Sequence, residues 1–147
     1  MRRFETNSEA ETEQAGADFA GTLPDGVVVA MYGELGSGKT AFVRGMARGM
    51  GIHCRVSSPT FTIVNEYEGE RELIHFDMYR LQSGDELFDI GWEDYLSRGG
   101  VCAVEWSENV QAAMEDAICV RIDKLPQEPD KRIITVTGGR FHGDLSL

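Results

Sequence analysis

Gly33-Glu34-Leu35-Gly36-Ser37-Gly38-Lys39-Thr40 matches the pattern G-x-x-x-x-G-K-[ST] at every fixed position. This stretch follows an apolar run at residues 27–32 and precedes a helical pattern, which is the strand–loop–helix context that the pattern requires. Glycines allow successive backbone N–H groups of such a loop to point inward at a phosphate chain. The alternative is a chance Gly-rich turn, and the flanking strand and helix argue against it. The stretch therefore predicts a site for a nucleoside triphosphate with magnesium.

The side chains at the end of this phosphate loop have expected roles. Lys39 would supply a positive charge to the β- and γ-phosphates, which makes it a candidate catalytic residue. The Thr40 hydroxyl would hold Mg²⁺. The residues expected to bind the nucleotide are Gly33, Leu35, Gly36, Ser37, Gly38, Lys39, Thr40 and Ala41.

Length and composition are typical of one globular domain, residues 1–147. The chain has 147 residues, of which 41% are hydrophobic and 27% are charged, and this is enough to build a core without disulfides. No apolar run is long enough to span a membrane, and the acidic N-terminal region is unlike a signal peptide. The three cysteines form no C-x-x-C pair and the three histidines are dispersed. We therefore expect no zinc site and a reduced, cytoplasmic location.

The net charge of −11 limits the partners of the chain. An acidic surface repels the phosphate backbone of a nucleic acid, and sequence-independent affinity depends on neutralising those phosphates. If the chain acts on a nucleic acid, we expect it to do so through a basic partner protein.

The order of elements predicts an α/β fold. Ser8 and Glu11 have the spacing of a capping box, which predicts a helix from Ser8 to about Leu23. The unbroken apolar run at 27–32 is typical of a central strand, and the helix after the phosphate loop ends near Gly51. Further strands are expected at 61–67, 73–76, 101–105, 117–122 and 132–137. Further helices are expected at 83–96 and 110–114, with a loop at 126–130 and a flexible tail from about 138.

A phosphate loop needs a second acidic group at the end of a neighbouring strand to complete the magnesium site. Glu105 ends one apolar run and Asp77 ends another, and either acid could simply mark the end of a strand. The run before Glu105 is more continuously apolar, which indicates a more central strand that lies closer to the loop. Glu105 is therefore the favoured metal ligand, and Asp77 is expected to position the attacking water.

Three other features are open to two interpretations. Residues 57–62 are rich in hydroxyls and could fold over the γ-phosphate, or could form an ordinary turn. Arg80 could contact a phosphate or a surface acid, and the acid is the default in a chain this acidic. Trp106 could belong to the core, which is the commoner case, or could anchor a partner.

Four segments of the chain resemble the TsaE family in their order and spacing. This family comprises bacterial ATPases needed for threonylcarbamoyladenosine modification of tRNA. The motifs cover about residues 33 to 106, and the capped N-terminal helix is also similar to that of the family. The segments are residues 33–40, Ser58-Pro59-Thr60-Phe61-Thr62, His75-Phe76-Asp77-Met78-Tyr79-Arg80-Leu81 and Val104-Glu105-Trp106.

The resemblance implies a P-loop NTPase domain with a mostly parallel sheet flanked by helices. It also implies ATP as the nucleotide and an ATPase, slow alone, that acts with the TsaD transferase and TsaB. Those proteins move the threonylcarbamoyl group onto adenosine 37 of tRNAs that read codons starting with A. By resemblance, Thr40 and Glu105 hold magnesium, and the segments around Thr60 and Asp77 act as switch-like elements near the γ-phosphate.

The chain departs from the family pattern at four positions. Glu34 and Ser37 replace the usual Asp and Ala in the loop, where the backbone makes the contacts, so we expect binding to survive. Ala41 replaces a second Thr, which could alter contact with the α-phosphate. Ser107 replaces a Pro and should affect only the following loop.

Two other classes of protein share such a loop. A small-metabolite kinase usually adds a lid with several arginines, whereas this chain has only Arg98 between Asp85 and Glu105. A non-catalytic subunit would use its loops only to report bound nucleotide. Turnover separates the three classes, since a kinase needs a phosphate acceptor and a pure switch shows no hydrolysis.

Overall fold

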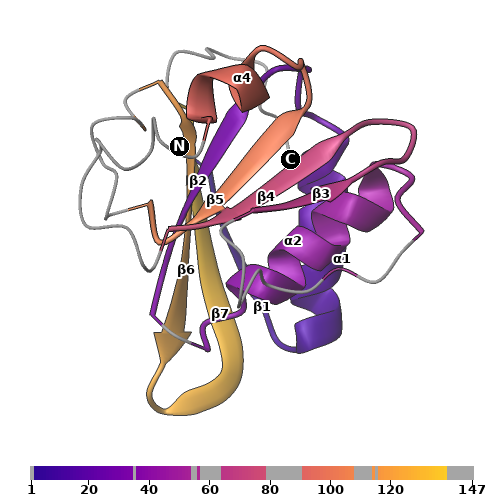
Figure 1. The fold of residues 1–147 in the computed structure, drawn as a ribbon. Coiled ribbons are helices and arrows are strands. Elements are labelled where there is room, and N and C mark those ends of the chain that lie inside the picture. The colour runs from indigo at the N-terminus through magenta and orange to yellow at the C-terminus, as the bar shows by residue number, and fades with distance from the viewer. Residues whose placement is uncertain are drawn as a thin grey trace.

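One mixed sheet of seven strands organises the molecule, in the spatial order β1-β7-β6-β2-β5-β4-β3 (Figure 1). The computed structural model describes residues 2–34, 36–53, 56, 64–78, 91–107, 114 and 116–138. The described helices are α1 (Glu9–Ala20), α2 (Lys39–Gly49) and α4 (Trp92–Leu96). The strands are β1 (Arg2–Thr6), β2 (Val28–Tyr32), β3 (Val64–Tyr67), β4 (Leu73–Asp77), β5 (Val101–Glu105), β6 (Ile118–Leu125) and β7 (Glu128–Thr137).

The centre of the sheet is parallel and its edges are antiparallel. Strands β6, β2, β5 and β4 run in the same direction, while β3, β7 and β1 pair antiparallel with their neighbours. Every residue of β5 is buried, as expected for a strand that is covered on both faces. The predicted α/β class, with a mostly parallel sheet, flanking helices and antiparallel edge strands, is confirmed.

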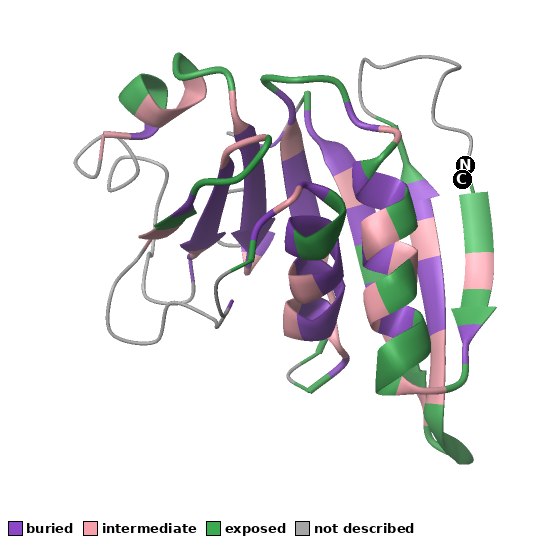
Figure 2. Ribbon diagram, turned by 90° about the vertical axis from the view of Figure 1, so that its right-hand side faces the viewer, coloured by how far each residue is buried: buried purple, intermediate pink, exposed green. Residues whose placement is uncertain are grey.

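Helices α1 and α2 lie side by side on one face of the sheet (Figure 2). Their apolar residues form the larger core together with alternate residues of β2, including Val29 and Met31. On the opposite face, Trp92 of α4 packs edge-on against Phe76 of β4, with ring centroids 5.0 Å apart. None of the helices in the described part of the chain is long and apolar enough to cross a membrane.

Glycines bring α1 and α2 into backbone contact. A Cβ on Gly45 would lie 1.7 Å from the carbonyl oxygen of Glu13, and a Cβ on Gly16 would lie 2.1 Å from that of Phe42. Glycine lowers helix propensity, so Gly45 and Gly49 count against a helix in α2 when the sequence is considered alone. The close approach of the two helices is what the glycines make possible, and α2 remains continuous from Lys39 to Gly49.

The start of α1 confirms the predicted capping box. The backbone N–H of Glu11 donates to the Ser8 hydroxyl at 3.1 Å, and the Glu11 carboxylate accepts from the backbone N–H of Asn7 at 3.0 Å. Both bonds satisfy N–H groups that have no partner inside the helix.

Two predictions about strands need correction. The sequence did not indicate β1, because Arg2–Thr6 carries little apolar periodicity and is held at the edge by backbone pairing with β7. The predicted loop at 126–130 is wrong in extent, since β7 already begins at Glu128 and only a short turn separates it from β6. Predicted elements at 61–63, 83–90 and 110–113, and the tail at 139–147, lie outside the described residues.

Candidate functional site

The phosphate loop has the backbone conformation that its glycines predict. Gly33, Gly36 and Gly38 have φ angles of 147°, 77° and 108°, all in the region that favours glycine. A Cβ on Gly33 would lie 2.5 Å from the carbonyl oxygen of Ile122 in β6. Inside the loop, the Ser37 N–H donates to the Glu34 carbonyl at 3.0 Å. Position 33, where the chain leaves β2, therefore has no room for a residue with a side chain.

Arg132 of β7 holds the outer side of this loop. Its Nε donates to the carbonyl oxygen of Ser37 at 2.7 Å, and its Nη1 donates to that of Pro129 at 2.6 Å. In a planar trans peptide the C=O and the following N–H point in opposite directions. The bond from Arg132 therefore orients the peptide between Ser37 and Gly38, with the Gly38 N–H directed away from Arg132.

Lys39 is the first residue of α2 and lies against the loop that precedes it. Its side chain is buried, and its Nζ donates to the Gly33 carbonyl at 2.7 Å. The same Nζ lies 4.3 Å from the ring centroid of Trp106, within the range of a cation–π contact. An ammonium group has three hydrogens to donate, so the Gly33 bond leaves donors for a phosphate.

Trp106 does more than fill the core. It has a φ of 59°, in the left-handed region that bulky residues rarely adopt, and it is half-buried. The residue packs against the apolar cluster that contains Phe76 and Trp92, and its ring also lies over Lys39. Core packing, the commoner fate that the sequence suggested, therefore describes only part of its environment.

Glu105 ends β5, the strand directly beside β2 (Figure 1). Val104 pairs with Ala30, so Glu105 lies at the carboxyl edge where β2 enters the phosphate loop. Ligands of open parallel sheets bind at this edge. The Glu105 carboxylate is 5% exposed and lies 2.5 Å from Nε2 of His75, which is itself fully buried.

Asp77 lies one strand further from the loop than Glu105. The two acids are register partners in the β4–β5 pair, and the N–H of Met78 donates to the Glu105 carbonyl at 3.0 Å. The structure thus brings both predicted acids to one edge of the sheet. The strand that ends in Glu105 lies beside β2, closer to the phosphate loop than the strand that ends in Asp77, as the apolar pattern predicted. Thr40 follows Lys39 in the first turn of α2 and is half-buried, and Ala41 beside it is buried.

Several predicted site residues cannot be placed. Leu35 of the phosphate loop, Thr60 with the rest of the hydroxyl-rich segment 57–62, and Arg80 lie outside the described residues. Within the described part, no group of three or more His, Cys, Asp or Glu side chains gathers as a metal cage. Glu105 and Thr40 carry oxygen donors, the kind that Mg²⁺ takes, commonly one or two carboxylates with phosphates and water in the rest of its shell.

Sequence reasoning did not assign the contacts of two residues in this region: it named His75 only as part of the segment 75–81, and the pair Lys131-Arg132 only as a possible contact for the adenine. His75 interrupts an apolar strand and stands two residues before Asp77, so both side chains share one face of β4. That alternation was a usable signal for a group near the acids. Arg132 offered no such signal, because 95 residues separate it from the carbonyl it holds and only the sheet order brings them together.

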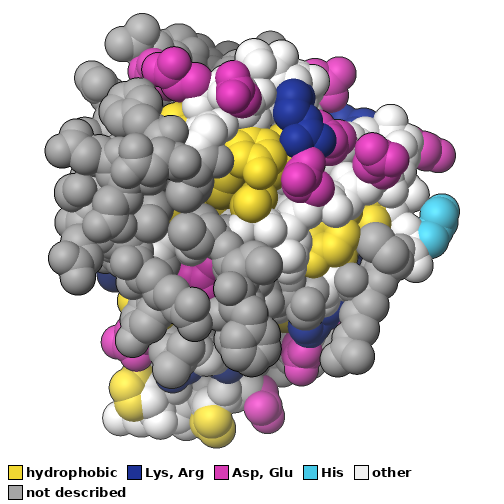
Figure 3. Space-filling model, in the orientation of Figure 1, with side chains coloured by type: hydrophobic (Ala, Val, Ile, Leu, Met, Phe, Trp, Pro, Cys, Tyr) yellow, Lys and Arg dark blue, Asp and Glu magenta, His cyan; other side chains and the backbone are white. Residues whose placement is uncertain are grey.

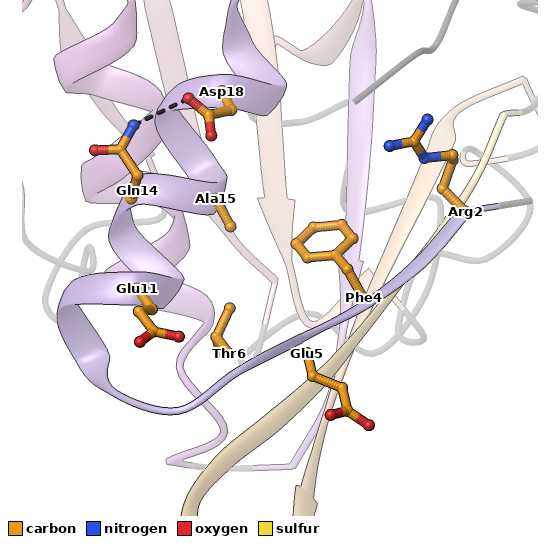
Figure 4. Close-up of a pocket in the computed structure, with 8 residues that line it drawn as sticks. All are labelled: Arg2, Phe4, Glu5, Thr6, Glu11, Gln14, Ala15 and Asp18. Atoms are coloured by element: carbon orange, nitrogen blue, oxygen red, sulfur yellow. Dashed lines mark hydrogen bonds between the residues drawn. The ribbon is translucent and has the colours of Figure 1, made fainter.

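A groove of about 320 Å³ lies elsewhere, between β1 and α1 (Figure 4). Phe4 and Ala15 supply its apolar lining, and the Gln14 amide donates to Asp18 at its edge at 2.9 Å. Thr6 is engaged with Thr12 at 2.7 Å between their hydroxyl oxygens. The groove contains neither Lys39 nor Glu105, and it offers no arrangement for nucleotide chemistry.

Comparison with known proteins gives one consistent result. A family model described as "Threonylcarbamoyl adenosine biosynthesis protein TsaE" matches residues 6–134. Curated relatives named tRNA threonylcarbamoyladenosine biosynthesis protein TsaE include one from Treponema pallidum, 40% identical over 114 residues, with 78% of this chain and 84% of the relative covered. One from Bacillus subtilis is 34% identical over 141 residues, with 95% and 88% covered.

A third relative and a solved structure agree. The protein of the same name from Haemophilus influenzae is 43% identical over 113 residues, covering 76% of this chain and 72% of the relative. A crystal structure of Bacillus subtilis YdiB superposes with a TM-score of 0.78 at 31% identity. That match covers 94% of this chain and 85% of YdiB, so the similarity extends over most of both chains.

Proposed function

The chain belongs to the TsaE family of threonylcarbamoyl adenosine biosynthesis proteins, and on that premise we propose that it binds ATP with Mg²⁺ and hydrolyses it to support this tRNA modification. TsaE proteins take part in tRNA threonylcarbamoyladenosine biosynthesis. Its proposed partners are TsaD and TsaB, which carry out the transfer onto adenosine 37. The proposed rate is slow for the chain alone and is raised by these partners.

One observation carries the proposal. The phosphate loop with Lys39 follows β2, and the acid Glu105 ends the adjacent parallel strand β5. A positively charged loop for phosphates and a carboxylate for a hard cation therefore meet at one edge of the sheet. This pairing is the minimum that a phosphate-loop ATPase needs.

Each described residue has a proposed role in this site. Lys39 exchanges its bond to the Gly33 carbonyl for the β- and γ-phosphates, and the loop N–H groups bind the same oxygens. Thr40 and Glu105 hold Mg²⁺, which would neutralise charge on the β- and γ-phosphate oxygens. Asp77 is proposed to position the attacking water, and Thr60, which lies outside the described residues, is proposed as a further catalytic residue.

The charges on the surface support a role on tRNA that is exerted through a partner. Most basic side chains of the described chain are already paired with acids. On the face in Figure 3, Asp and Glu side chains lie beside the basic side chains of the described residues that are in view. With a net charge of −11, few charges remain to neutralise tRNA phosphates. The paired residues are Arg44, Arg48, Arg71, Arg98, Arg121 and Lys131.

The kinase alternative receives no support from Arg98. This arginine pairs with Glu66 and Glu72 at the far end of the β3–β4 hairpin from Asp77, and these hydrogen bonds raise the pKa of its guanidinium. An arginine engaged in this way does not serve as a clamp for a transferred phosphoryl group.

Reconstitution of the modification tests the proposal. The components are TsaB, TsaD, threonylcarbamoyl-adenylate, tRNA and ATP, with and without this chain, and the readout is modified adenosine formed per transferase. We expect repeated turnover only when the chain and hydrolysable ATP are both present. Equal turnover without the chain would refute the proposed role.

A further inference from the structure

We infer that His75 is a positioning residue for Glu105, holding one carboxylate oxygen so that the other faces Mg²⁺. The inference rests on the magnesium role proposed above for Glu105. It concerns a side chain that lies in the segment 75–81 but had no role of its own assigned there, on a different strand from the acid it contacts.

The contact is short and sealed from water. Nε2 of His75 lies 2.5 Å from Oε2 of Glu105, with 0% of the His75 side chain and 5% of the Glu105 side chain exposed. A metal ligand must be a carboxylate, which can only accept, so the inference takes Nε2 of the imidazole as the donor. Charge-assisted bonds of this kind are directional and strong, and in a buried site water does not compete for them.

The strand register explains why the bond forms. His75 pairs with Ala103, and Asp77 pairs with Glu105, so the imidazole reaches diagonally along one face of the sheet. Ala103 leaves room for this because its side chain is only a methyl group. The bond occupies Oε2 and restricts rotation of the carboxylate, so Oε1 is the oxygen that this proposal assigns to the cation.

A packing role alone does not account for this histidine. Its neighbours Ile74 and Phe76 are fully buried apolar residues, and Nδ1 of His75 has no hydrogen-bond partner among the described residues. Burying an unpartnered ring nitrogen is unfavourable, and an apolar side chain would avoid it. The bond from Nε2 to Glu105 is the interaction that an apolar residue would lose.

Two substitutions separate positioning from packing. The amide nitrogen of Gln in His75→Gln takes the place of Nε2 and keeps the donor near Glu105. The amide of Asn in His75→Asn takes the place of Nδ1, which faces no described partner, and so removes the bond while keeping a polar side chain. ATP affinity is measured by calorimetry over a series of Mg²⁺ concentrations and again in EDTA.

We expect His75→Asn to raise the Mg²⁺ concentration at half-maximal effect by roughly 10- to 100-fold, the usual consequence of losing a group that orients a metal ligand. Its ATP affinity in EDTA should equal that of the unmodified chain, and His75→Gln should restore the Mg²⁺ response. An unchanged Mg²⁺ response in folded His75→Asn, or an equal loss of affinity with and without Mg²⁺, would overturn the inference.

Two further results complete the test. Nitrogen-15 NMR of the unmodified chain should show His75 protonated at Nε2, and a ring protonated only at Nδ1 would overturn the inference without any variant. If the unmodified chain binds ATP with no dependence on Mg²⁺, the proposed magnesium site itself fails. If that dependence is present and His75→Asn retains it, only the positioning role fails.

Discussion

The phosphate loop and the hydrogen-bonded pair Glu105–His75 are built in different ways at the same edge of the sheet. The loop would bind a phosphate chain through its backbone, and its shape depends on glycines that are close together in sequence. The pair Glu105–His75 consists of side chains from two strands, 30 residues apart, joined by one hydrogen bond. A site written in contiguous residues can be recognised from sequence, whereas a site assembled across strands requires the register. Substitutions in the loop, the loop half of the site, should therefore change ATP affinity in a different way from substitutions at Glu105 and His75, the magnesium half.

Loss of Lys39 is expected to have the largest effect on the loop half. Lys39→Ala removes the charge that would make charge-assisted hydrogen bonds to phosphate, each of about 1.5–3 kcal/mol, so ATP affinity should fall by roughly 100-fold or more. The loss should appear both with Mg²⁺ and in EDTA, measured by calorimetry. Arg48→Ala is the matched control, since it removes a positive charge from the exposed end of the same helix. Unchanged affinity in Lys39→Ala would remove the phosphate-loop assignment.

Loss of Glu105 should affect only the magnesium half. Glu105→Ala is expected to lower ATP affinity by roughly 10- to 100-fold in Mg²⁺ and to leave it unchanged in EDTA. Asp77→Ala should have a smaller effect on binding, because its strand lies one place further from β2. The comparison is made by titrating Mg²⁺ against each variant at fixed ATP. The reverse ranking would show that Asp77 is the metal ligand.

Arg132 tests whether the loop backbone is held in place from outside. Arg132→Ala removes the bond to the Ser37 carbonyl, worth about 1–2 kcal/mol, so ATP affinity should fall by roughly 10-fold. Because this bond orients the backbone, the loss should be the same with Mg²⁺ and in EDTA, unlike that of Glu105→Ala. Arg121→Ala, on the neighbouring strand and exposed, is the control. A loss confined to Mg²⁺ would contradict the division into two halves.

The smallest expected effect is on the reactivity of a thiol, that of Cys102, which lies in β5 on the opposite face of the sheet from Glu105. Burial raises the pKa of its thiol from 9.0 to about 12, so the thiol stays neutral and unreactive at pH 8. Because the folded pKa is raised, its contribution to stability is complete below pH 9 and is lost as the pH rises toward 12. Alkylation followed by mass spectrometry should modify Cys102 only in denaturant. Rapid labelling of the native chain would show that β5 is not a sealed strand.

The sequence predicted those parts of the fold whose signals are local. The capping box at Ser8, the central strand β2 and the α/β class needed only neighbouring residues. Strand β1 escaped prediction because its place depends on backbone pairing with β7, at the other end of the chain. The early start of β7 escaped because Pro129 suggested a loop, although it lies beyond the part of β7 that pairs with β1.

The same distinction applies to the candidate site. The loop glycines, Lys39 and the preference for Glu105 came from motif and hydrophobic pattern, and strand order agrees with the expectation that the strand before Glu105 lies closer to the loop than the strand before Asp77. His75 and Arg132 act across 30 and 95 residues, so their partners are defined only once the strands are in register. The low helix propensity of Gly45 counts against a helix at this position. The reason for the glycine is found only in the structure, where its backbone closely approaches that of Glu13.

The central claim is that the phosphate loop and the pair Glu105–His75 form one site for ATP and Mg²⁺. Calorimetric titration of ATP into the unmodified chain, in Mg²⁺ and again in EDTA, tests it most directly. We predict one ATP bound per chain in both conditions, with clearly tighter binding in Mg²⁺. The account would be contradicted by an absence of binding, or by affinities that do not differ between the two conditions.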